Sequence, residues 1–171
     1  VEILLIFVLE EDKSLFRFQD RFQMVKDGTE DLKNVYVFAS GKFMISSLTF
    51  PEYFIKEQMQ NVKINPVADV QMFAKYIAPR FNVSIRFVGT EPKDKVTEQY
   101  NRSLKELLPA YGIQLIEIPR RECMGKVITA TEVRKLLKEG RYEKLKSLVP
   151  DTTYEYLRNH GFLKERNIVD E

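Results

Sequence analysis

Residues 3–9 form an unbroken apolar run, Ile-Leu-Leu-Ile-Phe-Val-Leu, and this run restricts the possible folds more than any other feature of the chain. A strand that is apolar on both faces belongs inside a sheet covered on each side. Further strands are predicted at 35–38, 85–88 and 113–118, with helical patterns between them. This alternation predicts an α/β fold with a mainly parallel sheet covered on both faces.

Helices are predicted from apolar spacing and from residues typical of helix ends. The spacing of Phe18, Phe22 and Val25 predicts a helix that ends near Gly28. The other predicted helices are one opened by Thr49 and Glu52 and running to about 59, one from Asn65-Pro66 to before Pro79, one over 96–108, one from Thr129 to about 139, one over 142–149, and one capped by Thr152 with Glu155. Because the 171 residues contain no repeat or linker, we expect a single domain over residues 1–171.

Composition limits the kinds of partner. The formal charge of +2 is too small to favour a nucleic acid, and the local excess of basic residues at 120–141 suits a small anion. Cys123 is the single cysteine, so an intrachain disulfide is excluded and a cytoplasmic location is favoured. No apolar run approaches the roughly 18 residues of a membrane span, so no membrane partner is expected.

Residues 127–134 have the pattern of a helix N-terminus that holds phosphate. Thr129 and Glu132 have capping-box spacing, and the first-turn amides at Ala130 and Thr131 would point outward at the positive end of the helix dipole. Arg134 lies one turn in, on the basic face of the helix. The alternative is an ordinary capped surface helix with solvated basic residues.

Other residues with possible ligand contacts also follow predicted strands. Lys13 could place a charge on a phosphate, although a lone loop lysine is more often simply solvated. The turn Gly89-Thr90-Glu91 could approach a nucleotide closely or could only make a tight turn, and Arg120 could meet phosphate oxygens or be a solvated edge residue. In parallel sheets ligands bind at the carboxyl ends of the strands, so we expect these residues and the segment at 129–134 to converge there.

Several other kinds of site are weakly supported or excluded. Tyr53 and Phe54 could border a substrate pocket, although aromatic residues at helical spacing are usually part of a core. His160 is the only histidine, so the chain contains no two-histidine metal site, and one cysteine excludes a cysteine zinc set. A Ser-His-Asp arrangement, a Walker loop and a dinucleotide fingerprint are also absent from the sequence.

Taken together, these segments resemble the citrate lyase ligase family of the nucleotidyltransferase superfamily, over residues 8–157. The turn motif at 86–92 together with residues 49–58 carries the resemblance most specifically. The resemblance lies in five groups of segments. The first is residues 11–16 with Asp20-Arg21; the second is 49–51 with Tyr53-Phe54 and 56–58; the third is Ala68-Asp69 with 77–79. The fourth is 86–92 with Val96-Thr97 and Tyr100-Asn101, and the fifth is 118–120 with 128–131 and Val133-Arg134.

The resemblance implies a Rossmann-like nucleotidyltransferase fold and a reaction in two steps. Acetate and ATP would give acetyl-adenylate and pyrophosphate with Mg²⁺, and the acetyl group would then pass to the thiol of the prosthetic group on the citrate lyase acyl carrier subunit. It implies that Lys13 approaches the α-phosphate. Thr129, Ala130, Thr131 and Arg134 would hold the other phosphates. Gly89, Thr90 and Glu91 would line the adenosine side, Arg120 could add a phosphate contact, and Tyr53 and Phe54 could border the acyl or thiol pocket.

One signature of the superfamily, a His-x-Gly-His-like motif after the first strand, has no counterpart in this sequence. We therefore expect a C-terminal portion of a larger enzyme that lacks the first strand and helix of its sheet and exposes apolar edges. Two alternatives stay open. A phosphopantetheine-type adenylyltransferase would share the post-strand lysine and the helix at 129–134, although it fits residues 86–92 less well. A non-catalytic nucleotide-binding or scaffolding domain would need no histidine motif.

Overall fold

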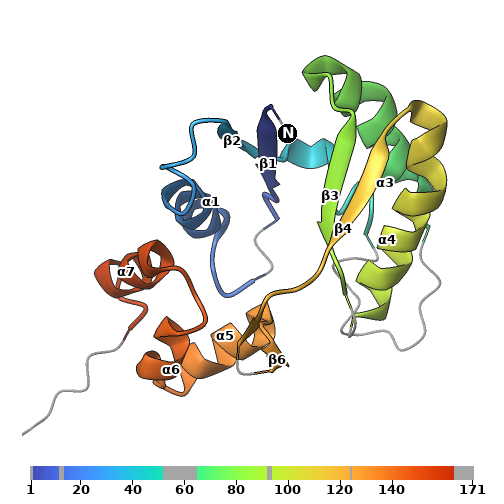
Figure 1. The fold of residues 1–171 in the computed structure, drawn as a ribbon. Helices are drawn as coiled ribbons and strands as arrows, with labels where there is room; N and C mark the ends of the chain where they lie inside the picture. The colour runs from blue at the N-terminus through green and yellow to red at the C-terminus, as the bar shows by residue number, and fades with distance from the viewer. Residues whose placement is uncertain (1, 12–13, 52–64, 92–93, 124, 164–171) are drawn as a thin grey trace, which may run out of the picture. The chain divides into compact units, whose positions relative to one another are not determined.

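A computed structural model describes residues 2–11, 14–51, 65–91, 94–123 and 125–163 (Figure 1). Helices and strands alternate along the chain, as the sequence predicts. The strands are β1 (Leu4–Val8), β2 (Val35–Ala39), β3 (Ile85–Gly89), β4 (Gln114–Ile118), β5 (Glu122–Cys123) and β6 (Lys126–Val127). The helices are α1 (Phe18–Asp27), η1 (Gly41–Phe43), α3 (Val67–Met72), η3 (Phe73–Ile77), η4 (Ala78–Phe81), α4 (Lys95–Leu107), η5 (Leu108–Tyr111), α5 (Ala130–Lys138), α6 (Tyr142–Lys146) and α7 (Asp151–Asn159).

The chain forms two compact units. Unit 1 contains Val1–Ile6, Leu15–Val37 and Arg121–Glu171, and unit 2 contains Phe7–Ser14 and Phe38–Arg120. Compact units of this kind can be parts of one domain, so the expected single-domain organisation stays a prediction.

The longer strands pair in parallel, which confirms the α/β class. β3 and β4 are parallel neighbours, in a register that runs from Ile85 opposite Gln114 to Gly89 opposite Ile118. β1 pairs with β2. The Leu4 amide donates to the Asn34 carbonyl and the Ser40 amide donates to the Val8 carbonyl, both at 2.9 Å. Residue numbers rise in the same direction along both strands, so β1 and β2 are parallel.

β1 is less buried than its sequence predicts. Only Val8 is buried within the strand, and the preceding Ile3 is 59% exposed. The reason lies in the pairing, because β1 has β2 at one edge and no strand among the described residues pairs with its other edge.

The helix ends agree with the sequence where local capping decides them. α1 ends before Gly28, and Thr129 caps α5. The prediction that Thr152 caps the last helix is wrong, because α7 begins at Asp151 directly after Pro150. The antiparallel β5–β6 hairpin was not predicted; Gly125 lies between its strands with a φ of 71°. The helix predicted beyond Thr49 falls mostly on residues 52–64, outside the described part.

The core of unit 2 encloses a polar network centred on Asp69 of α3, which is fully buried. Its Oδ1 accepts hydrogen bonds from the Ile45 amide at 2.6 Å and the Thr49 hydroxyl at 2.7 Å, and its Oδ2 accepts one from the Tyr100 hydroxyl at 2.6 Å. Arg86 Nη2 donates to the Tyr100 oxygen at 2.9 Å. Three donors suit a carboxylate, so the burial of Asp69 is compensated.

This network also changes the acidity of Tyr100. Burial raises the pKa of the Tyr100 hydroxyl well above its ordinary value; the charge of Arg86 opposes this change and Asp69 adds to it. The aromatic rings of Phe50 and Tyr100 stack with their centroids 5.1 Å apart, and the Arg86 guanidinium lies 4.3 Å from the centroid of Phe73. The network therefore lies inside an aromatic core. The buried apolar residues of this core are Met44, Phe50, Val70, Phe73, Ala74, Ala78, Val96, Tyr100, Leu104, Leu108 and Ile113.

Unit 1 has a separate apolar core, formed by buried leucines of α5, α6 and α7. Phe16 and Met24, from the N-terminal part of the chain, pack against these leucines. The Tyr156 hydroxyl of α7 donates to Asp20 of α1 at 2.9 Å. Burial, together with the hydrogen bond to Asp20, raises the pKa of Tyr156 to about 12. The buried leucines are Leu136, Leu137, Leu145 and Leu157.

Candidate functional site

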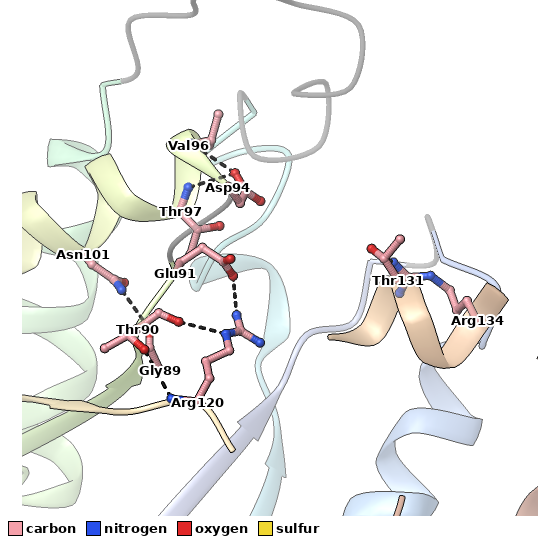
Figure 2. Close-up of polar contacts among 10 residues, drawn as sticks. All are labelled: Gly89, Thr90, Glu91, Asp94, Val96, Thr97, Asn101, Arg120, Thr131 and Arg134. Carbon is pink, nitrogen blue, oxygen red and sulfur yellow. Dashed lines mark hydrogen bonds and ion pairs between the residues drawn. The ribbon is translucent and has the colours of Figure 1, made fainter. Parts of the chain in front are cut away.

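The carboxyl ends of β3 and β4 are joined by the side chain of Arg120 (Figure 2). Its Nε donates to the Thr90 carbonyl at 2.8 Å, and its amide donates to the Thr90 hydroxyl at 3.2 Å. Its Nη2 forms an ion pair with the Glu91 carboxylate. The Nη1 donors take no part in these bonds. Two residues that the sequence analysis assigned to different ligand groups are thus partners of each other.

The strand register explains this pairing. Gly89 lies opposite Ile118 at the last paired position of β3 and β4. Two residues further along each parallel strand, Glu91 and Arg120 come side by side. The Glu91 side chain is only 14% exposed and that of Arg120 is 33% exposed, so the pair is partly shielded from water and is held better than a surface ion pair.

Gly89 is supported from α4 by a residue that the sequence analysis gave no role. The side-chain amide of Asn101 donates to the Gly89 carbonyl at 3.0 Å, and Asn101 is buried. A signal for it exists in the sequence, because Asn101 lies on the same helix face as the apolar Leu104 and Leu108, and a polar side chain there requires a partner. Among the described residues, apart from its two chain neighbours, a Cβ atom at position 89 would meet nothing within 4 Å, so the backbone there is open to close approach.

The N-terminus of α4 is also capped close to this turn. Asp94 accepts hydrogen bonds from the amides of Val96 at 3.0 Å and Thr97 at 3.2 Å. These bonds satisfy two of the first-turn donors of α4, so this helix start is already occupied by a carboxylate of the chain.

The segment at 129–134, which is predicted to hold phosphate, lies in unit 1, and the Thr129 half of its predicted capping box is formed. The Thr129 hydroxyl accepts from the Glu132 amide at 3.1 Å. Ala130 and Thr131 are exposed, and their amides have no acceptor within the helix because no turn precedes them. Arg134 Nη2 donates to the Thr131 hydroxyl at 3.3 Å, which directs the guanidinium toward the helix start (Figure 2).

The Glu132 carboxylate departs from the full capping box. It accepts from Lys144 Nζ of α6 at 3.5 Å. The opposite face of α5 buries Leu136 and Leu137, so the helix is fixed by its apolar side and presents Thr131, Arg134, Lys135 and Lys138 on the other. This arrangement can accept an anion at the first turn.

The predicted site residues are therefore found in separate places in the structure. Gly89, Thr90, Glu91 and Arg120 are brought together in unit 2, whereas residues 129–134 belong to unit 1. The convergence of the two groups on one ligand stays a prediction. Lys13, Tyr53 and Phe54 lie outside the described residues.

Metal ligands do not gather in the described part of the chain: it holds no group of three or more His, Cys, Asp and Glu side chains arranged to bind an ion. Mg²⁺ that enters with a nucleotide needs no such group, because it keeps several waters and binds mainly through the phosphates. Within the same part of the chain, no helix is long and apolar enough to cross a membrane.

Comparison with known proteins identifies a family. The family model described as the citrate lyase ligase C-terminal domain matches residues 1–157. Three curated proteins named citrate (pro-3S)-lyase ligase are similar to the chain. They are those of Haemophilus influenzae, 37% identical over 161 residues, Klebsiella pneumoniae, 35% over 156 residues, and Escherichia coli, 38% over 159 residues. These matches cover 91%, 89% and 90% of this chain but only 48%, 46% and 45% of the relatives, so the chain spans about half their length. No solved structure matches the chain.

Proposed function

The chain belongs to the citrate lyase ligase family, and on that premise we propose that it forms the nucleotide-handling part of an ATP-dependent ligase that acetylates citrate lyase. In the first step a carboxylate oxygen of acetate attacks the α-phosphorus of ATP. The bond from that phosphorus to the bridging oxygen breaks, giving acetyl-adenylate and pyrophosphate. In the second step the thiol sulfur on the acyl carrier subunit attacks the acetyl carbonyl, and AMP leaves. The cytoplasm supplies ATP and a reducing setting for that thiol.

The observation that carries this proposal is the first turn of α5. An attack by one anion on another requires the negative charge of ATP to be neutralised and held in place. The amides of the exposed residues Ala130 and Thr131, the Thr131 hydroxyl and Arg134 supply donors for the β- and γ-phosphates and for the leaving pyrophosphate. Mg²⁺, when bound with the nucleotide, would share the phosphate charge.

We assign the adenosine side to the turn at the end of β3. Gly89 offers an open backbone, and Arg120 holds the Glu91 carboxylate in one orientation suited to accept hydrogen bonds from a ribose. The Nη1 donors of Arg120 could in addition meet a phosphate oxygen. We assign Lys13 to the α-phosphate, and Tyr53 and Phe54 to the acyl or thiol pocket.

The test is acetate-dependent release of pyrophosphate from ATP. We would join the chain to the part of the Escherichia coli relative that the match does not cover, and measure release with and without acetate. Arg134→Ala should lower turnover by more than about tenfold, because a charge-assisted contact is worth about 1.5–3 kcal/mol. Lys138→Ala, one turn further along the same basic face, is the matched control.

The outcomes separate the rival functions. Release that requires phosphopantetheine and not acetate would indicate an adenylyltransferase of that type. Nucleotide binding without any release would indicate a binding or scaffolding domain. Equal turnover in the Arg134 and Lys138 variants would remove Arg134 from the site.

A further inference from the structure

Positive charge gathers on the outer side of α5 and on α6, both in unit 1. Residues 121–146 contain eight lysines and arginines against four glutamates, which is a net charge of +4. The whole chain has a net charge of only +2, so the remainder of the chain has a net charge of −2. The helices thus carry a cationic surface, which consists of Arg134, Lys135, Lys138, Arg141 and Lys144.

Two glutamates link the cations of this surface to one another. The Glu139 carboxylate lies 3.9 Å from Lys135 Nζ and 3.8 Å from Arg141 Nη1. The Glu132 carboxylate lies 3.5 Å from Lys144 Nζ and so joins α6 to the first turn of α5. The basic side chains of these pairs are 64%, 58% and 49% exposed, so each pair contributes only about 0–1 kcal/mol and can exchange partners. Five cations share two carboxylates, and the cationic surface keeps a net positive charge.

The fold does not depend on these cations. The opposite side of α5 is anchored by Leu136 and Leu137, and α6 is anchored by Leu145, all of them buried. Among the described residues, no exposed large apolar side chain lies on either helix. The cationic surface can therefore bind a partner, and it would recognise that partner by charge and not by apolar contact.

A nucleotide bound as proposed uses only one end of the cationic surface. Its phosphates contact the first turn of α5 and Arg134. Because an α-helix rises about 1.5 Å per residue, Lys138 lies about 6 Å further along the axis, and Arg141 follows the end of the helix. Lys138 is exposed and forms no ion pair with a described residue. These outer cations require a larger acidic ligand, and the small net charge of the chain disfavours a nucleic acid.

We propose that the cationic surface docks the acyl carrier subunit, through an acidic patch beside the prosthetic group of that subunit. The inference rests on the proposed function, in which the carrier thiol attacks the acetyl carbonyl of acetyl-adenylate. The carrier has to approach while the adenylate is still bound, so it must lie close to the first turn of α5. The cationic surface begins at that turn and extends away from it, which gives the carrier a place to bind beside the nucleotide.

Loss of charge at the outer end of the cationic surface should weaken the second step of the reaction and spare the first. Lys138→Ala with Arg141→Ala should lower kcat/KM for acetyl transfer to the carrier about tenfold at low salt, because charges of this kind mainly speed association. The difference should vanish at about 1 M salt, where the Debye length is about 3 Å. Lys138→Arg with Arg141→Lys keeps both charges and should stay within about twofold of the unsubstituted protein.

The experiment follows both steps in the chain joined to the uncovered part of the Escherichia coli relative. Acetate-dependent pyrophosphate release without the carrier reports the first step, and transfer of labelled acetyl to the purified carrier subunit reports the second. Lys26→Ala with Lys33→Ala is the matched control, because it removes the same charge from two exposed lysines of unit 1 outside the cationic surface. Circular dichroism melts show whether each variant is folded.

The outcomes separate the inference from the proposed function. Unchanged transfer in the Lys138 and Arg141 alanine variant, with normal pyrophosphate release, would overturn the inference and leave the proposed function standing. An equal loss in the matched control or in the charge-preserving variant, or a loss that persists at about 1 M salt, would also overturn it.

Duplex DNA provides a test of selectivity. If it inhibits transfer as strongly as a carrier subunit without its prosthetic group, the cationic surface binds any polyanion and the inference is overturned. No pyrophosphate release by the unsubstituted protein would reject the proposed function, and the inference with it.

Discussion

The hydroxyl group of Tyr100 offers the most direct measurement of the buried network in unit 2. Tyr100→Phe removes one oxygen that donates to Asp69 at 2.6 Å and accepts from Arg86 at 2.9 Å. A hydrogen bond to a charged group contributes about 1.5–3 kcal/mol, and the substitution leaves a buried carboxylate oxygen without its donor. Arg86 Nη1 already lacks a hydrogen-bond partner among the described residues. The substitution therefore removes a hydrogen bond from a guanidinium that already has an unsatisfied nitrogen. We expect unit 2 to lose about 3 kcal/mol of stability.

Tyr156→Phe provides the same chemical change in unit 1. Its hydroxyl donates to Asp20 at 2.9 Å in a partly buried place, so its removal should cost about 1.5 kcal/mol, at the low end of that range. Hydrogen exchange measured by mass spectrometry separates the two units, because peptides of α4 report on unit 2 and peptides of α7 on unit 1. A loss of about 3 kcal/mol corresponds to exchange about 10²-fold faster in α4.

The buried network also leads to a second, stricter prediction. If Asp69 and Tyr100 act as one unit, the double variant Asp69→Ala with Tyr100→Phe should be destabilised by at least about 1 kcal/mol less than the sum of the single variants. Additive losses of stability in the double variant would refute the reasoning that burial makes the Tyr100 hydroxyl important for the stability of unit 2. A smaller loss of stability in Tyr100→Phe than in Tyr156→Phe would refute it as well.

Three further predictions concern single contacts. Thr129→Ala should destabilise α5 by about 1 kcal/mol through loss of its cap, whereas Thr129→Ser should not; equal hydrogen exchange of α5 in both variants would contradict the cap. Asn101→Ala should cost about 1–3 kcal/mol in urea unfolding and raise the KM for ATP, because the Gly89 carbonyl loses its donor; an unchanged KM would separate Gly89 from the nucleotide. Because the folded state holds the Tyr156 proton up to a pKa of about 12, against 10.0 ordinarily, stability should fall as the pH rises between these values. Tyr156→Phe should flatten that fall, and an unaltered pH profile would show that another group causes it.

Local chemistry was readable from the sequence. Thr129 and Glu132 are three residues apart, so the cap of α5 depends on nothing outside that turn. The parallel pairing of β3 with β4 also follows from the alternation of strands and helices. The cap was predicted correctly because neighbouring residues determine it, and the parallel pairing because a helix lies between the two strands in the sequence.

Contacts between distant residues were not readable in the same way. Asp69 meets Tyr100 across 31 positions, and Glu91 meets Arg120 across 29. The second pairing depends on the strand register, which no local pattern gives, and the first depends on how α3 and α4 pack. β5 and β6 were missed because two residues are too few to show an alternating pattern.

The order of the segments along the chain has a consequence for synthesis. The chain passes between the two units at Ile6, Ser14, Val37 and Arg120. Every residue of unit 2 has therefore left the peptidyl transferase centre before the leucines of α5, α6 and α7 are made. The residues from Arg121 to the end of α7 at Asn159 take about 2–8 s at the usual 5–20 residues per second. During that interval the side chains of Phe16 and Met24 are not covered, because the leucines that pack against them have not yet been made. A chaperone that binds exposed apolar segments of nascent chains should recognise this stage, and its release should follow the emergence of α7 from the ribosome.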